Sequence, residues 1–135
     1  MINTDYLYDA FNGLEPHKDK DAAIKFCLNA VLMDCRFADL ETVMRDGADI
    51  GGMEGPPGWI IERCDEGATK GYEDWPESAR FRAFVDPESY ELAYPEFFCD
   101  KPTVEQYVRA AIRAYCNRHP ERNKETALIL QTLSR

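Results

Sequence analysis

The fold is decided by the stretch Trp59-Ile60-Ile61-Glu62-Arg63-Cys64, which is rich in residues that favour β-strands. A second stretch, Ala79-Arg80-Phe81-Arg82-Ala83-Phe84-Val85, alternates arginines with Phe81, Ala83 and Val85. This period of two predicts a half-buried strand. Turn-forming residues at 86–89 precede a third β-rich stretch, from Tyr90 to Tyr94. We therefore expect a small central antiparallel sheet of about three strands.

Helical periodicity flanks this sheet on both sides. Before it, the spacing of apolar residues predicts helices over 5–14, from 19–21 to about residue 35, and over 37–44. After it, Thr103 and Gln106 have the spacing of a capping box and predict a long helix that ends near His119. Pro120 suits the first position of a final helix. The class is therefore α+β, with N-terminal helices, a central sheet and two C-terminal helices in one domain over 1–135. The final helix is expected to bury Ala127, Leu128 and either Leu130 or Leu133.

Two connecting segments receive no strand in this interpretation. Residues 47–58 hold five glycines and two prolines, which argues against a regular element. This segment follows a helix and lacks a basic residue, so it is read as a turn region and not as a phosphate-binding loop. Pro95 to Phe98 is expected to form a short turn of helix.

Trp59 is expected in the core, whereas Trp75 suits the core and a partner-facing surface equally.

Length, hydropathy and cysteine usage bound the class of protein. The chain has 135 residues, 44% of them hydrophobic, and a mean hydropathy of −0.51. No apolar run approaches the ~18 residues of a membrane span. The first residues, Met1 to Tyr6, lack the features of a signal peptide. Five scattered cysteines do not form a disulfide framework, so we expect reduced thiols in a cytoplasmic protein.

The charge of the chain is unevenly distributed. Its net charge is −9, and residues 54–100 carry twelve acidic side chains against four basic ones, whereas residues 101–135 carry three against seven. An acidic surface argues against binding nucleic acid or anionic lipid. Aromatic side chains among carboxylates favour a basic protein partner. The candidate partner-facing residues are Glu54, Asp65, Glu66, Tyr72, Glu73, Asp74, Trp75 and Glu77.

The sequence offers no convincing reaction centre. His17 lies in a polar linker and His119 at a helix junction, so neither is favoured as a general base. Cys116 and His119 have the spacing of half a zinc site, without a second pair to complete it. Carboxylate pairs such as Glu73 and Asp74 are expected by chance among 25 acidic residues. We therefore expect no catalytic residue, no metal and no cofactor. The sequence predicts a protein that is not an enzyme.

Several short segments resemble a known family in their order along the chain. In the second half they are the strand 79–85, Tyr94-Pro95-Glu96-Phe97, Ala114-Tyr115-Cys116 and His119-Pro120-Glu121. In the first half, Cys35-Arg36-Phe37-Ala38-Asp39-Leu40 precedes a glycine-rich stretch and the first strand. This order, over residues 20–133, resembles the CdiI-type immunity proteins of bacterial contact-dependent growth inhibition, which neutralise ribonuclease toxins.

The resemblance implies a cytoplasmic protein that binds the C-terminal nuclease domain of a cognate toxin. It implies inhibition by electrostatic and steric occlusion of the nuclease site, without catalysis, cofactor, membrane or direct nucleic-acid binding. The interface of such proteins differs from pair to pair, so the resemblance transfers no site residue.

Three other interpretations of the sequence remain open. The chain could be an acidic interaction or adaptor domain without a toxin partner. It could be a small enzyme that uses buried carboxylates, for which a deep pocket between two facing carboxylates would be the sign. A nucleic-acid mimic is disfavoured, because the basic C-terminal segment interrupts the acidic field.

Overall fold

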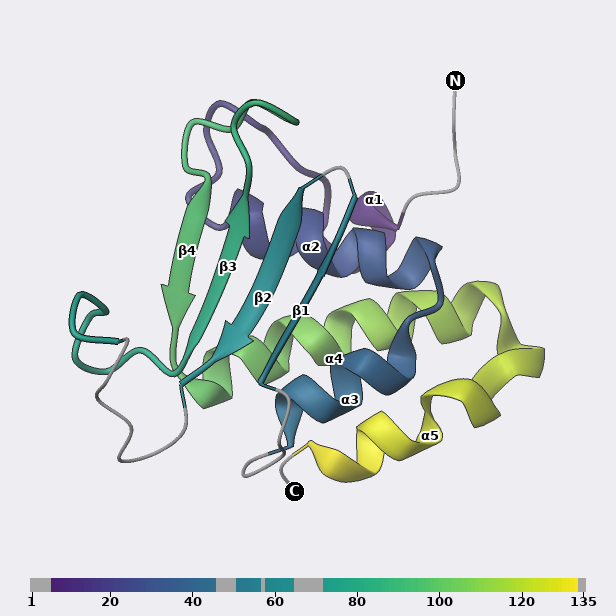
Figure 1. The fold of residues 1–135 in the computed structure, drawn as a ribbon. Coiled ribbons are helices and arrows are strands. Elements are labelled where there is room, and N and C mark those ends of the chain that lie inside the picture. The colour runs from purple at the N-terminus through teal and green to yellow at the C-terminus, as the bar shows by residue number, and fades with distance from the viewer. Residues whose placement is uncertain (1–5, 46–50, 57, 65–71, 134–135) are drawn as a thin grey trace.

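The computed structural model describes residues 6–45, 51–56, 58–64 and 72–133, and it has the predicted α+β class (Figure 1). N-terminal helices precede a four-stranded antiparallel sheet, which two C-terminal helices follow. The elements are α1 (Leu7–Phe11), α2 (Ala22–Met33), α3 (Phe37–Met44), β1 (Gly52–Gly55), β2 (Trp59–Arg63), β3 (Phe81–Val85), β4 (Glu96–Cys99), α4 (Lys101–Arg118), a 3₁₀ turn (Pro120–Arg122) and α5 (Asn123–Thr132).

The sheet is a simple meander in which neighbours along the chain are neighbours in space. Its order is β1-β2-β3-β4, and all three pairings are antiparallel. In β2 and β3 every second residue is buried, as the predicted alternation requires. Trp59, Ile61, Phe81, Ala83 and Val85 lie on the buried side, which confirms the expected positions of Trp59 and of the inward row of β3.

The glycine-rich segment contains a strand, contrary to the expectation. Gly52–Gly55 forms β1 and pairs residue by residue with β2, where Met53 lies opposite Ile61. Gly55 is required for this pairing, because a Cβ atom there would lie 2.9 Å from the Trp59 ring. Low strand propensity is therefore outweighed by pairing with β2 and by burial of Met53.

The last strand is also displaced from its predicted position. Residues 90–94 form no strand, and all of them except Leu92 are exposed. Pairing with β3 begins at Pro95, whose carbonyl oxygen accepts a hydrogen bond from the Val85 amide, and continues through β4. The expected helical turn at 95–98 is thus a strand, stabilised by Phe97 against Tyr107 of α4.

The helices cover one side of the sheet. Figure 1 shows α2 and α4 crossing behind the strands, with α3 beside β1 and α5 beside α3. The buried stripe of α2 includes Cys27, Leu28 and Val31, and it packs mainly against β3. Among the described helices, none is long and apolar enough to cross a membrane.

The two C-terminal helices depart from the sequence prediction in detail. The α4 helix starts at Lys101 and not at the predicted cap Thr103, because the Asp100 side chain accepts a hydrogen bond from the Thr103 amide at 3.0 Å. The 3₁₀ turn from Pro120 precedes α5, which buries Thr126 and Ile129, with Leu133 buried just after the helix. The predicted core residues Ala127 and Leu128 are exposed instead, and of the alternatives Leu130 and Leu133 it is Leu133 that is buried.

A buried arginine joins the sheet to α3. Arg63 ends β2 and is only 3% exposed. Its Nη1 atom donates to the carbonyl oxygens of Thr42, Val43 and Arg45, at 3.0, 2.7 and 2.9 Å. These carbonyls lie at the C-terminal end of α3, where helices present acceptors without intrahelical partners and negative partial charge. Arg63 therefore satisfies the end of α3 from within the core.

Candidate functional site: the open face of the sheet

The side of the sheet opposite the helices carries a mixed acidic and aromatic surface, which we call the open face. Its residues alternate with the buried ones, and the strand register sets them in two rows. The first row is Glu54, Ile60, Phe84 and Glu96. The second row is Glu62, Arg82 and Phe98. Asp86, two residues beyond Phe84, extends the same face.

Arg82 organises the centre of the open face. Its guanidinium pairs with Glu62 on one side and with Glu96, at 2.6 Å, on the other. Partial burial disfavours the charged form of Arg82, but the hydrogen bonds to both carboxylates outweigh it and raise its pKa. The described open face thus has four carboxylates (those of Glu54, Glu62, Asp86 and Glu96) and two guanidinium groups, those of Arg82 and of Arg80, which directly precedes β3 on the same side. It is net acidic, and both cations have acceptors within the protein: Arg82 pairs with Glu62 and Glu96, and Arg80 Nε donates to the Cys64 carbonyl oxygen at 2.8 Å.

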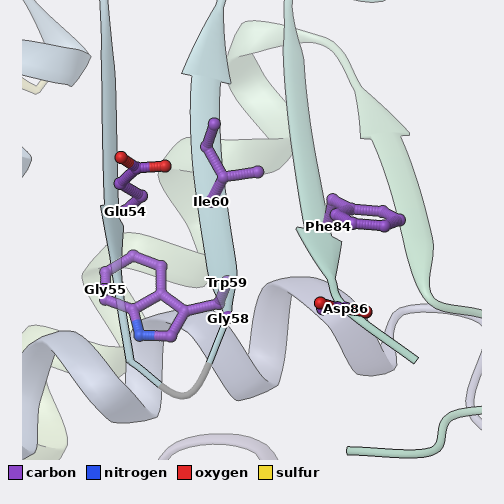
Figure 2. A pocket seen from close by; sticks show the side chains of 7 residues that line it. All are labelled: Glu54, Gly55, Gly58, Trp59, Ile60, Phe84 and Asp86. Atoms are coloured by element: carbon purple, nitrogen blue, oxygen red, sulfur yellow. The ribbon is translucent and has the colours of Figure 1, made fainter. Parts of the chain in front are cut away.

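A hollow of about 470 Å³ lies at one end of the open face (Figure 2). It is lined by Glu54, Gly55, Gly58, Trp59, Ile60, Phe84 and Asp86. Gly58 has φ +148°, and a Cβ atom there would lie 2.9 Å from the Ser89 hydroxyl and 3.0 Å from the Asp86 Cβ. The absence of a side chain at this position therefore permits both the turn and the close approach of Asp86.

The segment before β3 packs onto the opposite corner of the open face. Trp75 makes edge contacts with Tyr72 and with Phe98 of β4, with ring centroids 4.9 and 5.2 Å apart. The Tyr72 hydroxyl donates to the Arg63 carbonyl oxygen at 3.3 Å. Trp75 is half-buried, so it is neither a core residue nor a fully exposed surface residue. A second hollow, of about 360 Å³, lies beside this pair of rings and is lined partly by Glu73 and Glu77.

The candidate partner-facing residues fall into two groups. Tyr72, Glu73, Asp74, Trp75 and Glu77 gather near the β4 edge, and their three carboxylates are exposed. Glu54 is exposed on β1, the opposite edge, three strand spacings or roughly 14 Å away. Asp65 and Glu66 lie outside the described residues.

The sequence analysis did not identify the open-face residues that lie between these two groups. The alternation of inward and outward residues along β2 and β3 could have indicated them. The missed members of the open face are Ile60, Glu62, Arg82, Phe84, Asp86, Glu96 and Phe98. Those in β2 and β3 alternate with the core residues that the pattern identified. Their exposure follows from the position of the helices, which the strand pattern alone does not give.

Two of the cysteines, Cys27 and Cys99, are protected from reaction. Burial raises the pKa of the Cys27 thiol to about 12, against the opposing effect of contacts with the Phe84 and Ile60 carbonyl oxygens. Burial, together with the neighbouring charge of Asp100, also raises the pKa of Cys99 to about 12. Both thiols therefore remain protonated near neutral pH and are poor nucleophiles.

Cys116 and His119, which have the spacing of half a zinc site, contact other side chains in the fold. Cys116 Sγ lies 3.2 Å from the Thr126 hydroxyl, and His119 Nε2 lies 3.0 Å from the Tyr6 hydroxyl. Within the described part of the chain, no group of three or more histidine, cysteine or acidic side chains could hold a metal ion.

Among the residues that the structure describes, two carboxylates are buried, at Glu41 and Glu105, and neither lines the hollow of the open face. Burial disfavours ionisation of Glu41, but hydrogen bonds from Thr132 at 2.7 Å and Arg45 at 3.0 Å outweigh it and lower the pKa. A general acid near neutral pH needs the opposite shift. Glu41 therefore has a structural role between α3 and α5.

Comparisons of the chain with protein-family models, with curated proteins and with solved structures found no match. The likeness to CdiI-type immunity proteins therefore stays a prediction from the order of short segments. The function must be inferred from the open face itself.

Proposed function

We propose that this protein is an immunity protein that holds a basic nuclease toxin domain, of the ribonuclease class, against its open face. The observation that carries the proposal is the uncovered side of the sheet, where Ile60, Phe84 and Phe98 lie among four carboxylates. Aromatic and apolar side chains in such a surface supply affinity, and the surrounding charges select a basic partner and accelerate its association.

Inhibition follows from the same chemistry. A nuclease binds phosphate with lysine and arginine side chains, and carboxylates form charge-assisted hydrogen bonds with the same groups. A protein that pairs its glutamates and aspartates with these cations occupies the place of the nucleic acid. The antiparallel sheet fixes the backbone that carries the carboxylates, and Arg82 holds those of Glu62 and Glu96, so less ordering is required when the partner binds.

Two further features support an intracellular inhibitor. All five cysteines are free thiols, as in proteins of the reducing cytoplasm, where we place this protein. The family resemblance of segments in both halves of the chain points to the same class of function.

The experiment is to identify the partner and measure its activity with and without this protein. Tagged protein captures its partner from the native cells, and the partner is then separated under denaturing conditions and refolded. The refolded partner is assayed on RNA and on DNA. We expect a basic protein with nuclease activity, lost when one molar equivalent of this protein is added.

Two results would contradict the proposal. A captured protein without nuclease activity would favour the adaptor interpretation. A nuclease whose activity is unchanged by a stoichiometric amount of this protein would show binding without inhibition. Glu54→Lys combined with Glu96→Lys serves as the control variant, and it is expected to inhibit only at much higher concentration.

A further inference from the structure

We propose that the hollow at the end of the open face binds an arginine side chain of the partner, stacked on Phe84 and paired with Asp86 and Glu54. This inference rests on the proposed function in one respect only, namely that the partner is a basic protein. It adds the place and the chemical nature of the contact.

The stacking surface is one face of the Phe84 ring. On β3 the outward neighbours of Phe84 are Arg82 on one side and Asp86 on the other, because outward residues recur every second position. The Arg82 guanidinium carbon lies over the ring, 4.8 Å from its centroid. Figure 2 shows the ring nearly edge-on, with Asp86 farther along the strand, and the ring lines the hollow. The protein therefore already stacks one guanidinium on Phe84, and the hollow offers a place for a second.

The acceptors of the second guanidinium are carboxylates on two sides of the hollow. Asp86 is held in a turn, where its Oδ1 atom accepts a hydrogen bond from the Glu88 amide at 3.0 Å. Glu54 stands two strands away, roughly 10 Å in the sheet. The backbone at Glu54 is fixed too, since its carbonyl oxygen accepts from Arg36 Nη1 at 2.6 Å. The Asp86 carboxylate is thus in place before a partner arrives, whereas the exposed carboxylate of Glu54 is carried by a fixed backbone.

The shape and lining of the hollow favour arginine over other cations. Ile60 lies between Glu54 and Phe84 in the row and offers an apolar surface to the aliphatic part of a long side chain. A planar guanidinium stacks on an aromatic ring and directs five N–H donors outward, whereas the lysine ammonium is a compact, strongly hydrated charge. With only two carboxylates among its lining residues, the hollow is a poor site for a metal ion.

The test uses Nα-acetyl-arginine amide, which has the side chain of arginine within a protein and no free carboxylate. It is titrated into the whole protein, and backbone amide shifts are followed by NMR. We expect saturable shifts at millimolar concentrations, confined to the neighbourhood of Gly58, Ile60, Phe84 and Asp86. Nα-acetyl-citrulline amide, which is nearly isosteric and uncharged, should give no saturable shift.

Matched variants assign the effect to the hollow. Asp86→Asn keeps an oxygen for the Glu88 amide and removes the charge, so it should weaken binding about three- to five-fold, the scale of a partly exposed charge pair. Glu88→Gln removes a carboxylate from the same turn but outside the lining of the hollow, and should leave binding unchanged. Phe84→Leu should weaken binding while both carboxylates remain.

The inference is overturned if the shifts are absent, if they spread over all acidic residues, or if citrulline amide reproduces them. Free arginine carries a carboxylate that the acidic face repels, so stronger binding of free arginine would indicate a metabolite site and also overturn it. The probe reports on the hollow whether or not the partner is a nuclease. If the arginine amide does not bind but the captured nuclease is inhibited, the proposed function stands without this inference. If the arginine amide binds but the captured partner is not an inhibited nuclease, only the arginine site in the hollow stands.

Discussion

The two sides of the sheet use the same strands for different purposes. On β3, Phe81, Ala83 and Val85 are at most 2% exposed against the helices, whereas Arg82 and Phe84 between them are half-buried on the open face. The inner side has the pattern of a core, and the outer side has a paired arginine, aromatic rings and carboxylates. Residues that stabilise the fold and residues proposed to bind the partner thus alternate along one strand, so substitutions can test the two roles separately.

The largest difference in stability is expected between alanine variants of the two phenylalanines of β3, Phe81 and Phe84. Phe81→Ala opens a cavity in the core and should lower the free energy of unfolding by about 3–5 kcal/mol. Phe84→Ala removes a half-buried ring that can be replaced by water and should cost about 1 kcal/mol. Urea unfolding measured for both variants checks this difference. Equal losses would mean that the open face is part of the core.

A second pair of variants compares Arg63 and Arg82, which lie on opposite sides of the sheet. Arg63→Gln leaves the carbonyl oxygens at the end of α3 poorly satisfied in the core and should cost about 3 kcal/mol. Arg82→Gln breaks partly exposed ion pairs and should cost about 1 kcal/mol or less. Thermal and urea unfolding of both variants measure the two costs. A larger loss for Arg82→Gln would contradict the assignment of Arg82 to a surface network.

The smallest expected effect on stability concerns acidic residues and pH. The folded pKa of Glu41 is lowered, so its stabilising effect is complete above its unfolded pKa of about 4.3 and is lost as pH falls through the folded value. Glu41→Gln should therefore cost about 1 kcal/mol at pH 7, and this difference should shrink below about pH 4. Glu54→Gln, on the open face, is the control and should leave the free energy of unfolding nearly unchanged. A Glu41→Gln deficit that grows on acidification would contradict the direction of the shift.

Sequence patterns predicted the elements whose signals are local. The alternation in 79–85 and the apolar stripes of α2, α3 and α4 gave the two central strands and the main helices in order. They failed at β1 and β4, where glycine and proline suggest turns and where pairing with a central strand decides the conformation. They failed in part for the final helix, where Thr126 and Ile129 are buried in place of Ala127 and Leu128, while Leu133 is buried as one predicted alternative had it.

The candidate site was predicted in part for a similar reason. Composition pointed to Glu54 and to the segment around Trp75, since aromatic and acidic residues cluster there in the sequence. The surface between them depends on strand order and on which side the helices cover. Neither is encoded in a single strand, so Glu62, Arg82 and Phe84 emerged only from the folded structure.

The affinity of the captured partner for charge-reversed variants, measured by calorimetry, tests most directly whether the partner binds the open face. Glu54→Lys with Glu96→Lys reverses two charges on the open face. Asp34→Lys with Glu121→Lys makes the same change in net charge at exposed positions in the helical part of the molecule. Unfolding curves first establish that both double variants are folded.

Like charges placed across an interface cost several kcal/mol, so the open-face variant should bind about 100-fold more weakly. The helix-side variant should stay within about three-fold of the unmodified protein, since its charges lie outside the two rows of the open face and salt screens their effect on the partner. Equal weakening by both variants would mean that the partner responds to net charge alone. Unchanged binding by the open-face variant would place the interface elsewhere and contradict the central claim.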